Sequence, residues 1–218
     1  MIEKIVKVPS FLIFQFKKRF LKISHQRKNL NRVEAKWELI NTNLPNSPGS
    51  LFDIGCNEGL FSVNASQQGW FVWGIDFHNN AISYAVKNAE REGVENAFFS
   101  SGKITPENVK QLPEFDVIFL LSIFQEICSQ YGLKKGYEIF DDLLKICRKA
   151  LFFEPSSINR KYGQGNKVFE VDNDLESIKK WANFLVSRSQ GWKARYIGKT
   201  EYTSNEPYRF MFLIERDK

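Results

Sequence analysis

The sequence has few of the residues that build metal centres and disulfide frameworks. Its 218 residues include two histidines, His25 and His78, and three cysteines, Cys56, Cys128 and Cys147, with no CxxC pair. Two histidines exclude a multi-histidine metal site, and an odd number of widely spaced cysteines indicates neither zinc ligation nor a disulfide framework. We therefore expect no bound metal, and reduced thiols in a cytoplasmic protein.

The sequence also lacks a long apolar run. The stretch Val8–Phe16 is shorter than the ~18 apolar residues of a membrane helix, and the basic residues Lys17–Arg19 follow it, on the wrong side for a signal peptide. The net charge of +6 is concentrated in residues 1–40, with ten Lys/Arg against three Asp/Glu. This segment could contact nucleic acid, a charged glycan or, through residues 1–24, a membrane surface, although a solvated helix face is more frequent.

Turn-forming residues divide the chain. Residues 43–50 are rich in Pro, Asn and Gly and predict a boundary between a basic helical segment over 1–48 and a domain over 49–218. Helical patterns are found at 10–24, 31–42, 58–68, 80–92, 133–148 and 174–187. Strand patterns are found at 50–55, 70–76, 96–100, 115–122, 150–155, 192–198 and 208–216.

Strands that alternate with helices predict an α/β fold whose parallel sheet is covered on both faces. The last two strands are separated only by residues 199–207, which is too short for a helical crossover, so they should pair as an antiparallel hairpin. We expect a Rossmann-like three-layer sandwich with a seven-stranded, mostly parallel sheet, a terminal antiparallel hairpin and N-terminal helices.

A glycine loop follows the first strand of the domain, in LFDIGCNEGL at residues 51–60. Ligands of open parallel sheets bind beyond the carboxyl ends of the strands, which is where this loop falls. A phosphate-binding P-loop would need Lys after its last glycine, but Leu60 follows Gly59. A dinucleotide loop would need a middle glycine, and Asn57 stands there.

Acidic residues narrow the choice of ligand. Asp53, Glu58 and Asp76 would surround a pyrophosphate with negative charge, whereas a helix N-terminus that binds phosphate needs donors. S-adenosylmethionine has a sulfonium and an ammonium and no phosphate, so it fits. Asp76 lies about twenty residues beyond Gly55, where an acidic residue binds ribose hydroxyls, and Phe77 could lie against the adenine.

The sequence resembles the class I S-adenosylmethionine-dependent methyltransferases. The resemblance covers roughly residues 50–218 and includes the terminal hairpin. Its motifs are DIGCNEG at 53–59, GIDFHNNAISYA at 74–85 and FDVIFLLSIF at 115–124. The sequence is also similar, more loosely, to a subgroup found with polysaccharide and glycolipid enzymes, through RVEAKW at 32–37 and FFEPSS at 152–157.

The resemblance implies a role for each matching residue in binding the cofactor. The methionine part would be wrapped by Gly55, Cys56, Asn57 and Gly59, with Asp53 toward its ammonium and Arg32 toward its carboxylate. The ribose would bind Asp76, the adenine would lie beside Phe77, Ser101, Gly102 and Lys103, and Ser122 and Phe124 would border the transferred methyl group. Many relatives have an Asp for the adenine amino group where this chain has Ser101–Lys103.

The sequence defines the acceptor of the methyl group less clearly than it defines the cofactor. A hydroxyl acceptor benefits from a general base, and the candidates are Glu126, His78 and Glu154. The leading interpretation is methyl transfer to a small-molecule or glycan acceptor, at a hydroxyl. One alternative is an RNA methyltransferase that uses the basic N-terminal segment, although the Pro-Pro-Tyr type motif used on base amines is missing. The other alternative is a non-catalytic cofactor-binding protein.

Overall fold

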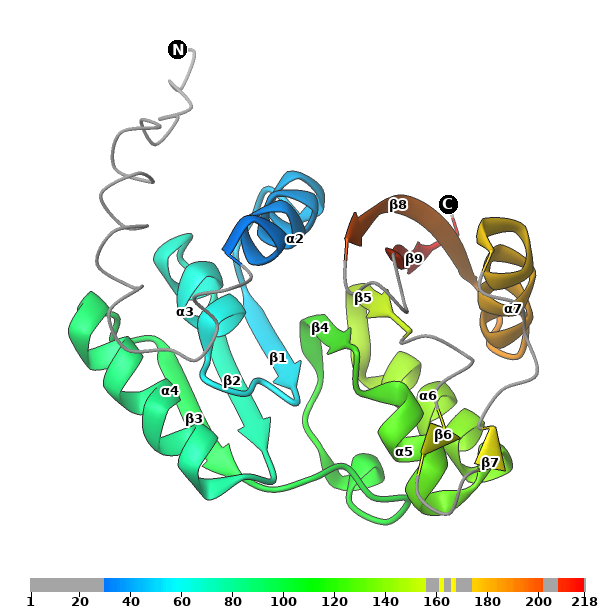
Figure 1. Ribbon diagram of the computed structural model, residues 1–218, viewed down its shortest axis with the longest axis horizontal. Helices are drawn as coiled ribbons and strands as arrows, with labels where there is room; N and C mark the ends of the chain where they lie inside the picture. Colours follow the sequence, from blue (N-terminus) through cyan, green and yellow to red (C-terminus); the bar gives the residue numbers. More distant parts are fainter. Residues whose placement is uncertain (1–29, 156–160, 163–165, 168–173, 202–207, 218) are drawn as a thin grey trace.

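The computed structural model describes residues 30–155, 161–162, 166–167, 174–201 and 208–217 (Figure 1). The helix predicted at 10–24 lies outside these ranges. A seven-stranded sheet has the order β3-β2-β1-β4-β5-β9-β8. Its strands are β1 (Ser50–Ile54), β2 (Phe71–Asp76), β3 (Ala97–Ser101), β4 (Phe115–Leu121), β5 (Cys147–Glu154), β8 (Trp192–Glu201) and β9 (Tyr208–Arg216).

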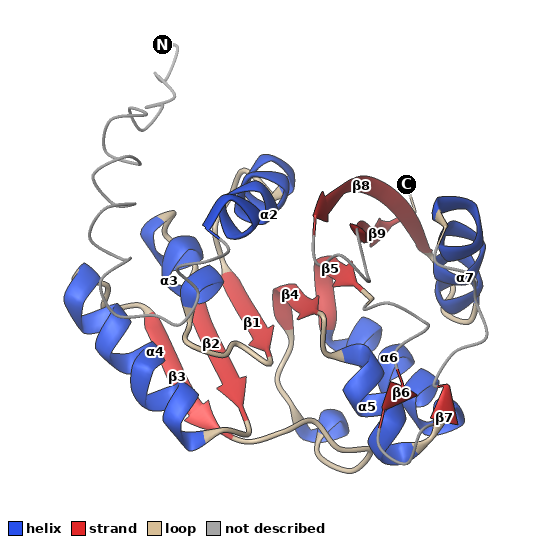
Figure 2. Cartoon of the chain, in the orientation of Figure 1, coloured by secondary structure: helices blue, strands red, loops and turns tan. Residues whose placement is uncertain are grey.

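Strands β1 to β5 are parallel, and Figure 2 shows the arrowheads of β1, β2 and β3 pointing the same way. Strand β9 is antiparallel to both of its neighbours, β5 and β8. The predicted seven-stranded sheet with a terminal antiparallel hairpin is therefore confirmed. The sheet places the carboxyl ends of β1, β2 and β4 side by side, which brings the glycine loop next to the ends of the other two strands.

Helices cover both faces of the sheet (Figure 1). They are α2 (Leu30–Asn43), α3 (Leu60–Gln67) and α4 (Asn79–Glu92) on one face, and α5 (Phe124–Tyr131), α6 (Leu133–Ile146) and α7 (Leu175–Ser187) on the other. Two apolar clusters form the core. Phe152 packs toward α2 and α3, whereas the next residue, Phe153, packs toward α5, α6 and α7, as the alternation of side chains along a strand requires.

In the part of the chain that the structure describes, the connections hold three short elements. A 3-10 helix spans Val109–Gln111, and β6 (Lys161–Tyr162) pairs with β7 (Asn166–Lys167) in a two-stranded hairpin. Helix α7 begins after Asp174, whose carboxylate accepts from the Ser177 amide at 2.9 Å and so caps the N-terminus of the helix.

Three helices differ from the sequence prediction by two residues or more. The helix predicted at 133–148 ends at Ile146, and β5 begins at Cys147. Helix α3 begins at Leu60, not at 58, because Asn57 and Gly59 have positive φ and cannot join a right-handed helix. Helix α5 was not predicted, although it buries Phe124 and Ile127 at helical spacing.

The sequence also predicts no membrane helix and no disulfide framework. Within the described residues, no helix combines the length and the apolarity that crossing a membrane requires. The three cysteines are buried as free thiols.

Candidate functional site

The loop between β1 and α3 contains three residues with positive φ. Gly55, Asn57 and Gly59 have φ of 73°, 50° and 74°, a left-handed conformation that glycine adopts without strain and that Asn tolerates better than most residues. The amides of Gly55 and Cys56 donate to the carbonyl oxygen of Ile75, at 2.8 and 2.9 Å. The loop is therefore fastened across the carboxyl end of β2.

Packing requires glycine at Gly59 in this loop and at Gly74 in the neighbouring strand β2. A Cβ atom at Gly59 would lie 2.8 Å from Cβ of Ala85 and 2.9 Å from the Phe99 ring, and a Cβ atom at Gly74 would lie 2.8 Å from the same ring. All three distances are below those of ordinary carbon contacts. The loop can approach β3 and α4 only because these positions have no side chain.

Asp76 ends β2 and orients the loop that it faces. Its Oδ2 accepts from the Asn57 amide at 3.0 Å, and its Oδ1 accepts from the His78 amide at 2.9 Å. The His78 Nδ1 atom lies 3.2 Å from the same Oδ1. A carboxylate has about four acceptor positions, so two backbone hydrogen bonds fix the direction of Asp76 and leave it able to accept from a ligand.

Asp53 lies in β1 and is only 3% exposed. Ser62 Oγ donates to its Oδ2 at 2.6 Å. Burial raises the pKa of Asp53 from 3.8 to about 7; the hydrogen bond from Ser62 opposes this rise, and the charge of Asp76 adds to it. Burial also raises the pKa of the Cys56 thiol, so this thiol stays protonated. A cation close to Asp53 would favour its charged form.

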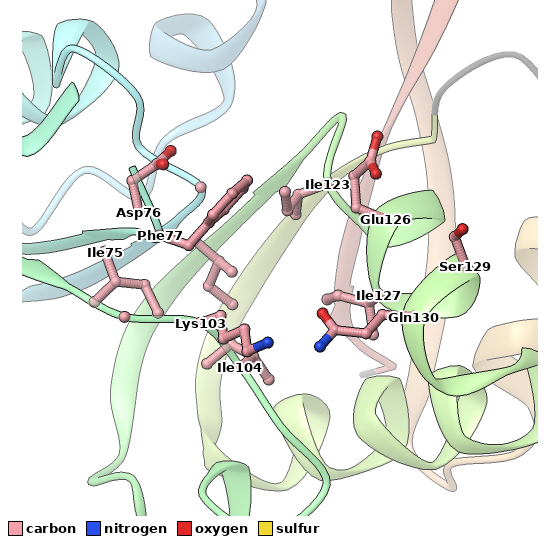
Figure 3. Close-up of a pocket in the computed structure, with 13 residues that line it drawn as sticks. Ile75, Asp76, Phe77, Lys103, Ile104, Ile123, Glu126, Ile127, Ser129 and Gln130 are labelled. Carbon is pink, nitrogen blue, oxygen red and sulfur yellow. The ribbon is translucent and has the colours of Figure 1, made fainter. Parts of the chain in front are cut away.

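A first cavity, of about 260 Å³, opens beyond the ends of β1 and β2. Figure 3 shows Asp76 and Phe77 on one wall, Glu126 and Gln130 of α5 on the opposite wall, and Lys103 between them. The cavity brings together six of the predicted site residues, which are Gly55, Asp76, Phe77, Gly102, Lys103 and Glu126.

A second cavity, of about 310 Å³, lies beneath α2. Gly55 belongs to the linings of both cavities, so they adjoin at the carboxyl end of β1. The predicted residues in the second lining are Arg32, Asp53, Gly55, Cys56, Asn57 and Ser122, and residues that were not predicted include Lys36, Phe61, Thr200 and Arg209.

Behind the second cavity, Glu154 is fully buried at the end of β5. Its Oε1 accepts from Lys36 Nζ at 2.7 Å and also from Ser122 Oγ. Arg209 Nη1 donates to Ser122 Oγ at 2.5 Å and lies 3.8 Å from the same Oε1. Lys36, Ser122 and Arg209 line the cavity while Glu154 does not, so the carboxylate holds three lining side chains from behind.

Five predicted residues line neither of these two cavities. Glu154 lies behind the second cavity, and Gly59 lies against Ala85 and Phe99. Phe124 is fully buried and packs edge-on against Phe153, because α5 turns its first residue into the core; its neighbour Ile123 lines the first cavity instead. Ser101 is exposed on the edge strand β3, and the side chain of His78 is 64% exposed. Sequence position placed these residues near the site but could not give the direction of their side chains.

Three of the lining residues that were not predicted differ in the signal that the sequence offered for them. Gln130 belongs to α5, whose buried residues at helical spacing were the available signal. Lys36 follows Arg32 by four positions, which places both on the same face of α2, and this spacing could have drawn attention to Lys36. Arg209 lies in a strand far from the loop in sequence, and no pattern links it to Glu154.

Comparison with known proteins identifies the class. A model of the methyltransferase domain family matches residues 46–180, more than half of the chain, so the chain belongs to this family. With its seven-stranded sheet, it is a class I S-adenosylmethionine-dependent methyltransferase.

Two relatives illustrate the similarity. The bifunctional O-antigen chain terminator methyltransferase/kinase WbdD of Escherichia coli is 28% identical over 198 residues, which are 90% of this chain and 24% of WbdD. The chain thus spans about a quarter of the length of this relative. A putative ribosomal RNA large subunit methyltransferase of Methanocaldococcus jannaschii is 29% identical over 64% of this chain and 38% of its own length.

Solved structures show the same fold. A structure of WbdD superposes with a TM-score of 0.65 at 22% identity, over 89% of this chain and 40% of that chain. The crystal structure of magnesium protoporphyrin IX methyltransferase from Synechocystis PCC 6803, with bound S-adenosylmethionine, superposes with a TM-score of 0.62 at 14% identity, over 98% of this chain and 100% of that chain.

Proposed function

We propose that the chain transfers the methyl group of S-adenosylmethionine to a hydroxyl of a glycan or another small molecule. The observation that carries this proposal is that Gly55 lines two adjoining cavities, one beside Asp76 and one beside Asp53. The nucleoside half of the cofactor would occupy the first cavity and its amino-acid half the second. When bound, the cofactor supplies a methyl group made electrophilic by the positive sulfur.

In the first cavity, Asp76 would accept from the two ribose hydroxyls, because its backbone hydrogen bonds already fix its direction. Phe77 would lie against the adenine, and the backbone of Ser101–Lys103 would border the adenine edge. Gln130 stands across the cavity from Asp76 and Phe77 (Figure 3). Adenine is uncharged, so an aromatic ring and backbone groups can bind it without a charged side chain.

In the second cavity, Asp53 would face the ammonium of the amino-acid half, which would favour the charged form of this buried carboxylate. Gly55, Cys56, Asn57 and Gly59 would wrap this half of the cofactor, and Ser122 would border the methyl group. The carboxylate of the cofactor would lie toward the basic residues of α2, among them Arg32.

Glu126 is the proposed general base for the acceptor hydroxyl. It is exposed in the first turn of α5 and lines the first cavity, so a substrate proton can reach it. His78 is also exposed, but its ring lies beside Asp76 Oδ1 and outside both linings. Glu154 is enclosed behind the second cavity. A general base must first lie within reach of the proton that it takes from the acceptor. Among the three candidates, this requirement favours Glu126.

Two features favour a glycan over RNA as the acceptor. WbdD, described as an O-antigen chain terminator, is similar over 90% of this chain. The ribosomal RNA methyltransferase relative matches over 64%. In addition, the sequence FDVIFLLSIFQE at 115–126 lacks the Pro-Pro-Tyr type motif that is used on base amines.

The test is a transfer assay with methyl-labelled S-adenosylmethionine against free sugars, lipid-linked glycans and RNA. The expected result is label on a glycan, lost in Glu126→Gln with cofactor affinity unchanged. Label on RNA alone, with a steep loss of activity as salt rises, would overturn the glycan assignment. Cofactor binding without transfer to any of the three acceptor classes would support the non-catalytic alternative.

A further inference from the structure

Lys36 presents its ammonium to the second cavity from α2. Its Nζ lies 2.7 Å from Glu154 Oε1, and its side chain keeps 15% exposure whereas Glu154 has none. An ammonium has three N–H donors, and among the described residues Glu154 is its hydrogen-bond acceptor. The remaining donors of Lys36 are therefore available to a ligand in the cavity that it lines.

The position of this ammonium is fixed before any ligand arrives. Glu154 comes from β5, 118 positions along the chain, and Ser122 and Arg209 bind or flank the same oxygen, Oε1. The centroid of the Phe61 ring lies 5.9 Å from Lys36 Nζ. A lysine held in this way has already lost the side-chain freedom that binding would otherwise cost.

The cavity holds charges of both signs. Asp53 and Lys36 belong to the same lining, and an α-amino acid has an ammonium and a carboxylate on one carbon. A buried carboxylate suits the first group and a held ammonium suits the second. The pairing matches the amino-acid half of the cofactor, so this inference rests on the proposed placement of that half in the second cavity.

We infer that Lys36 is a cofactor-binding residue that receives the carboxylate of the amino-acid half, and that Glu154 is a positioning residue that holds Lys36 for this contact. The surroundings of Glu154 fit this positioning role better than a role as general base. Its Oε1 already accepts from Lys36 and Ser122, and its Oε2 is buried without a hydrogen-bond partner in the described part of the chain.

Calorimetry with two ligands tests this inference without knowledge of the acceptor. S-adenosylhomocysteine has the carboxylate, and its decarboxylated counterpart, S-adenosyl-3-thiopropylamine, keeps the nucleoside, the sulfur and the amine. We expect the full wild-type chain to prefer S-adenosylhomocysteine by about tenfold or more, the ratio that one charged hydrogen bond provides. In Lys36→Met this preference disappears because affinity for S-adenosylhomocysteine falls, while affinity for the amine is unchanged.

Further variants separate positioning from folding. Lys36→Arg keeps the positive charge and should restore part of the preference. Glu154→Gln should reduce the preference in the wild-type background and have no further effect in Lys36→Met, as expected for residues that act through one contact. Lys135→Met, an exposed lysine of α6, is the matched control and should change neither affinity.

Two sets of results would overturn the inference. In the first, Lys36→Met weakens both ligands equally, which indicates a structural role. In the second, Lys36→Met leaves the preference intact while Arg32→Met abolishes it, which assigns the carboxylate to Arg32 alone. A wild-type chain that binds neither ligand would instead refute the proposed placement of the cofactor, so the two failures are distinguishable.

Discussion

Asp76 Oδ2 accepts a hydrogen bond from the backbone amide of Asn57 at 3.0 Å, across 19 positions of sequence. The acidic residue at the end of β2 therefore holds the glycine loop that follows β1. With the His78 amide on its other oxygen at 2.9 Å, the carboxylate has one fixed direction. One side chain thus shapes the loop and presents acceptors to the first cavity.

Replacing Asp76 is predicted to weaken cofactor binding severely. Asp76→Ala removes the acceptors proposed for two ribose hydroxyls and also releases the Asn57 amide, so affinity for S-adenosylmethionine should fall by about a hundredfold or more. Asp76→Asn keeps the shape and should lose less. Isothermal titration calorimetry measures both, with thermal unfolding as the check on folding. An unchanged dissociation constant in Asp76→Ala would contradict the ribose assignment.

Asp53 is predicted to make the stability of the ligand-free chain depend on pH. Its pKa is about 7 in the folded chain, against the ordinary value of 3.8 that it takes in the unfolded chain. Between these two pH values the folded chain therefore binds more protons than the unfolded chain. The contribution of Asp53 is complete below pH 3.8 and is lost as pH rises through about 7. The full loss is roughly 4 kcal/mol of unfolding free energy.

Urea unfolding of wild type and Asp53→Asn at several pH values checks this dependence. The amide cannot ionise, so the variant should gain stability relative to wild type as pH rises toward about 8. Other groups contribute equally to both proteins and cancel in the difference. Parallel stability profiles for the two proteins would show that Asp53 is not the group responsible.

The same carboxylate is predicted to link cofactor binding to proton release. An ammonium beside Asp53 lowers its pKa, so at a pH of about 6 binding should release a proton, and affinity should rise as pH increases toward about 7. Calorimetry in two buffers of different ionisation enthalpy measures the released proton. Asp53→Asn is expected to bind without this release. Equal proton release in the variant would assign the proton to another group.

Two glycines with similar backbone angles are predicted to respond differently to alanine. Gly59→Ala places a Cβ atom 2.8 Å from Ala85 and should cost about 2–4 kcal/mol, from the left-handed backbone together with the clash. Gly93 has φ of 65° but nothing within 4 Å of a Cβ atom, so Gly93→Ala should cost only about 1–2 kcal/mol. Equal losses in denaturant unfolding would show that packing behind the loop contributes nothing.

Much of the fold could be predicted because each strand of the seven-stranded sheet and most helices carry their own local pattern. Strand β4 could be predicted from its almost wholly apolar run, and the hairpin of β8 and β9 from the short connection between two strand patterns. Helix α5 was not predicted because its eight residues, Phe124–Tyr131, follow β4 almost without a break, and short apolar segments do not separate helix from strand. The start of α3 depended on the backbone angles of Asn57 and Gly59, which the sequence does not state.

The candidate site could be predicted where residues are neighbours in sequence. The glycine loop and Asp76 lie at the ends of adjacent strands, so strand topology alone brings them together. The contact of Lys36 with Glu154 joins residues 118 positions apart, and no spacing rule links them. The inward rotation of Phe124 likewise depends on the helix that begins at this residue, so its neighbour Ile123 reaches the cavity instead.

A crystal structure of the chain with S-adenosylhomocysteine tests the central claim most directly, because it places both halves of the ligand at once. The account predicts the ribose hydroxyls on the Asp76 carboxylate and the amino-acid half beneath α2, between Asp53 and Lys36. A ligand that leaves Asp76 without contact, or that places its amino-acid half in the first cavity, would contradict the account.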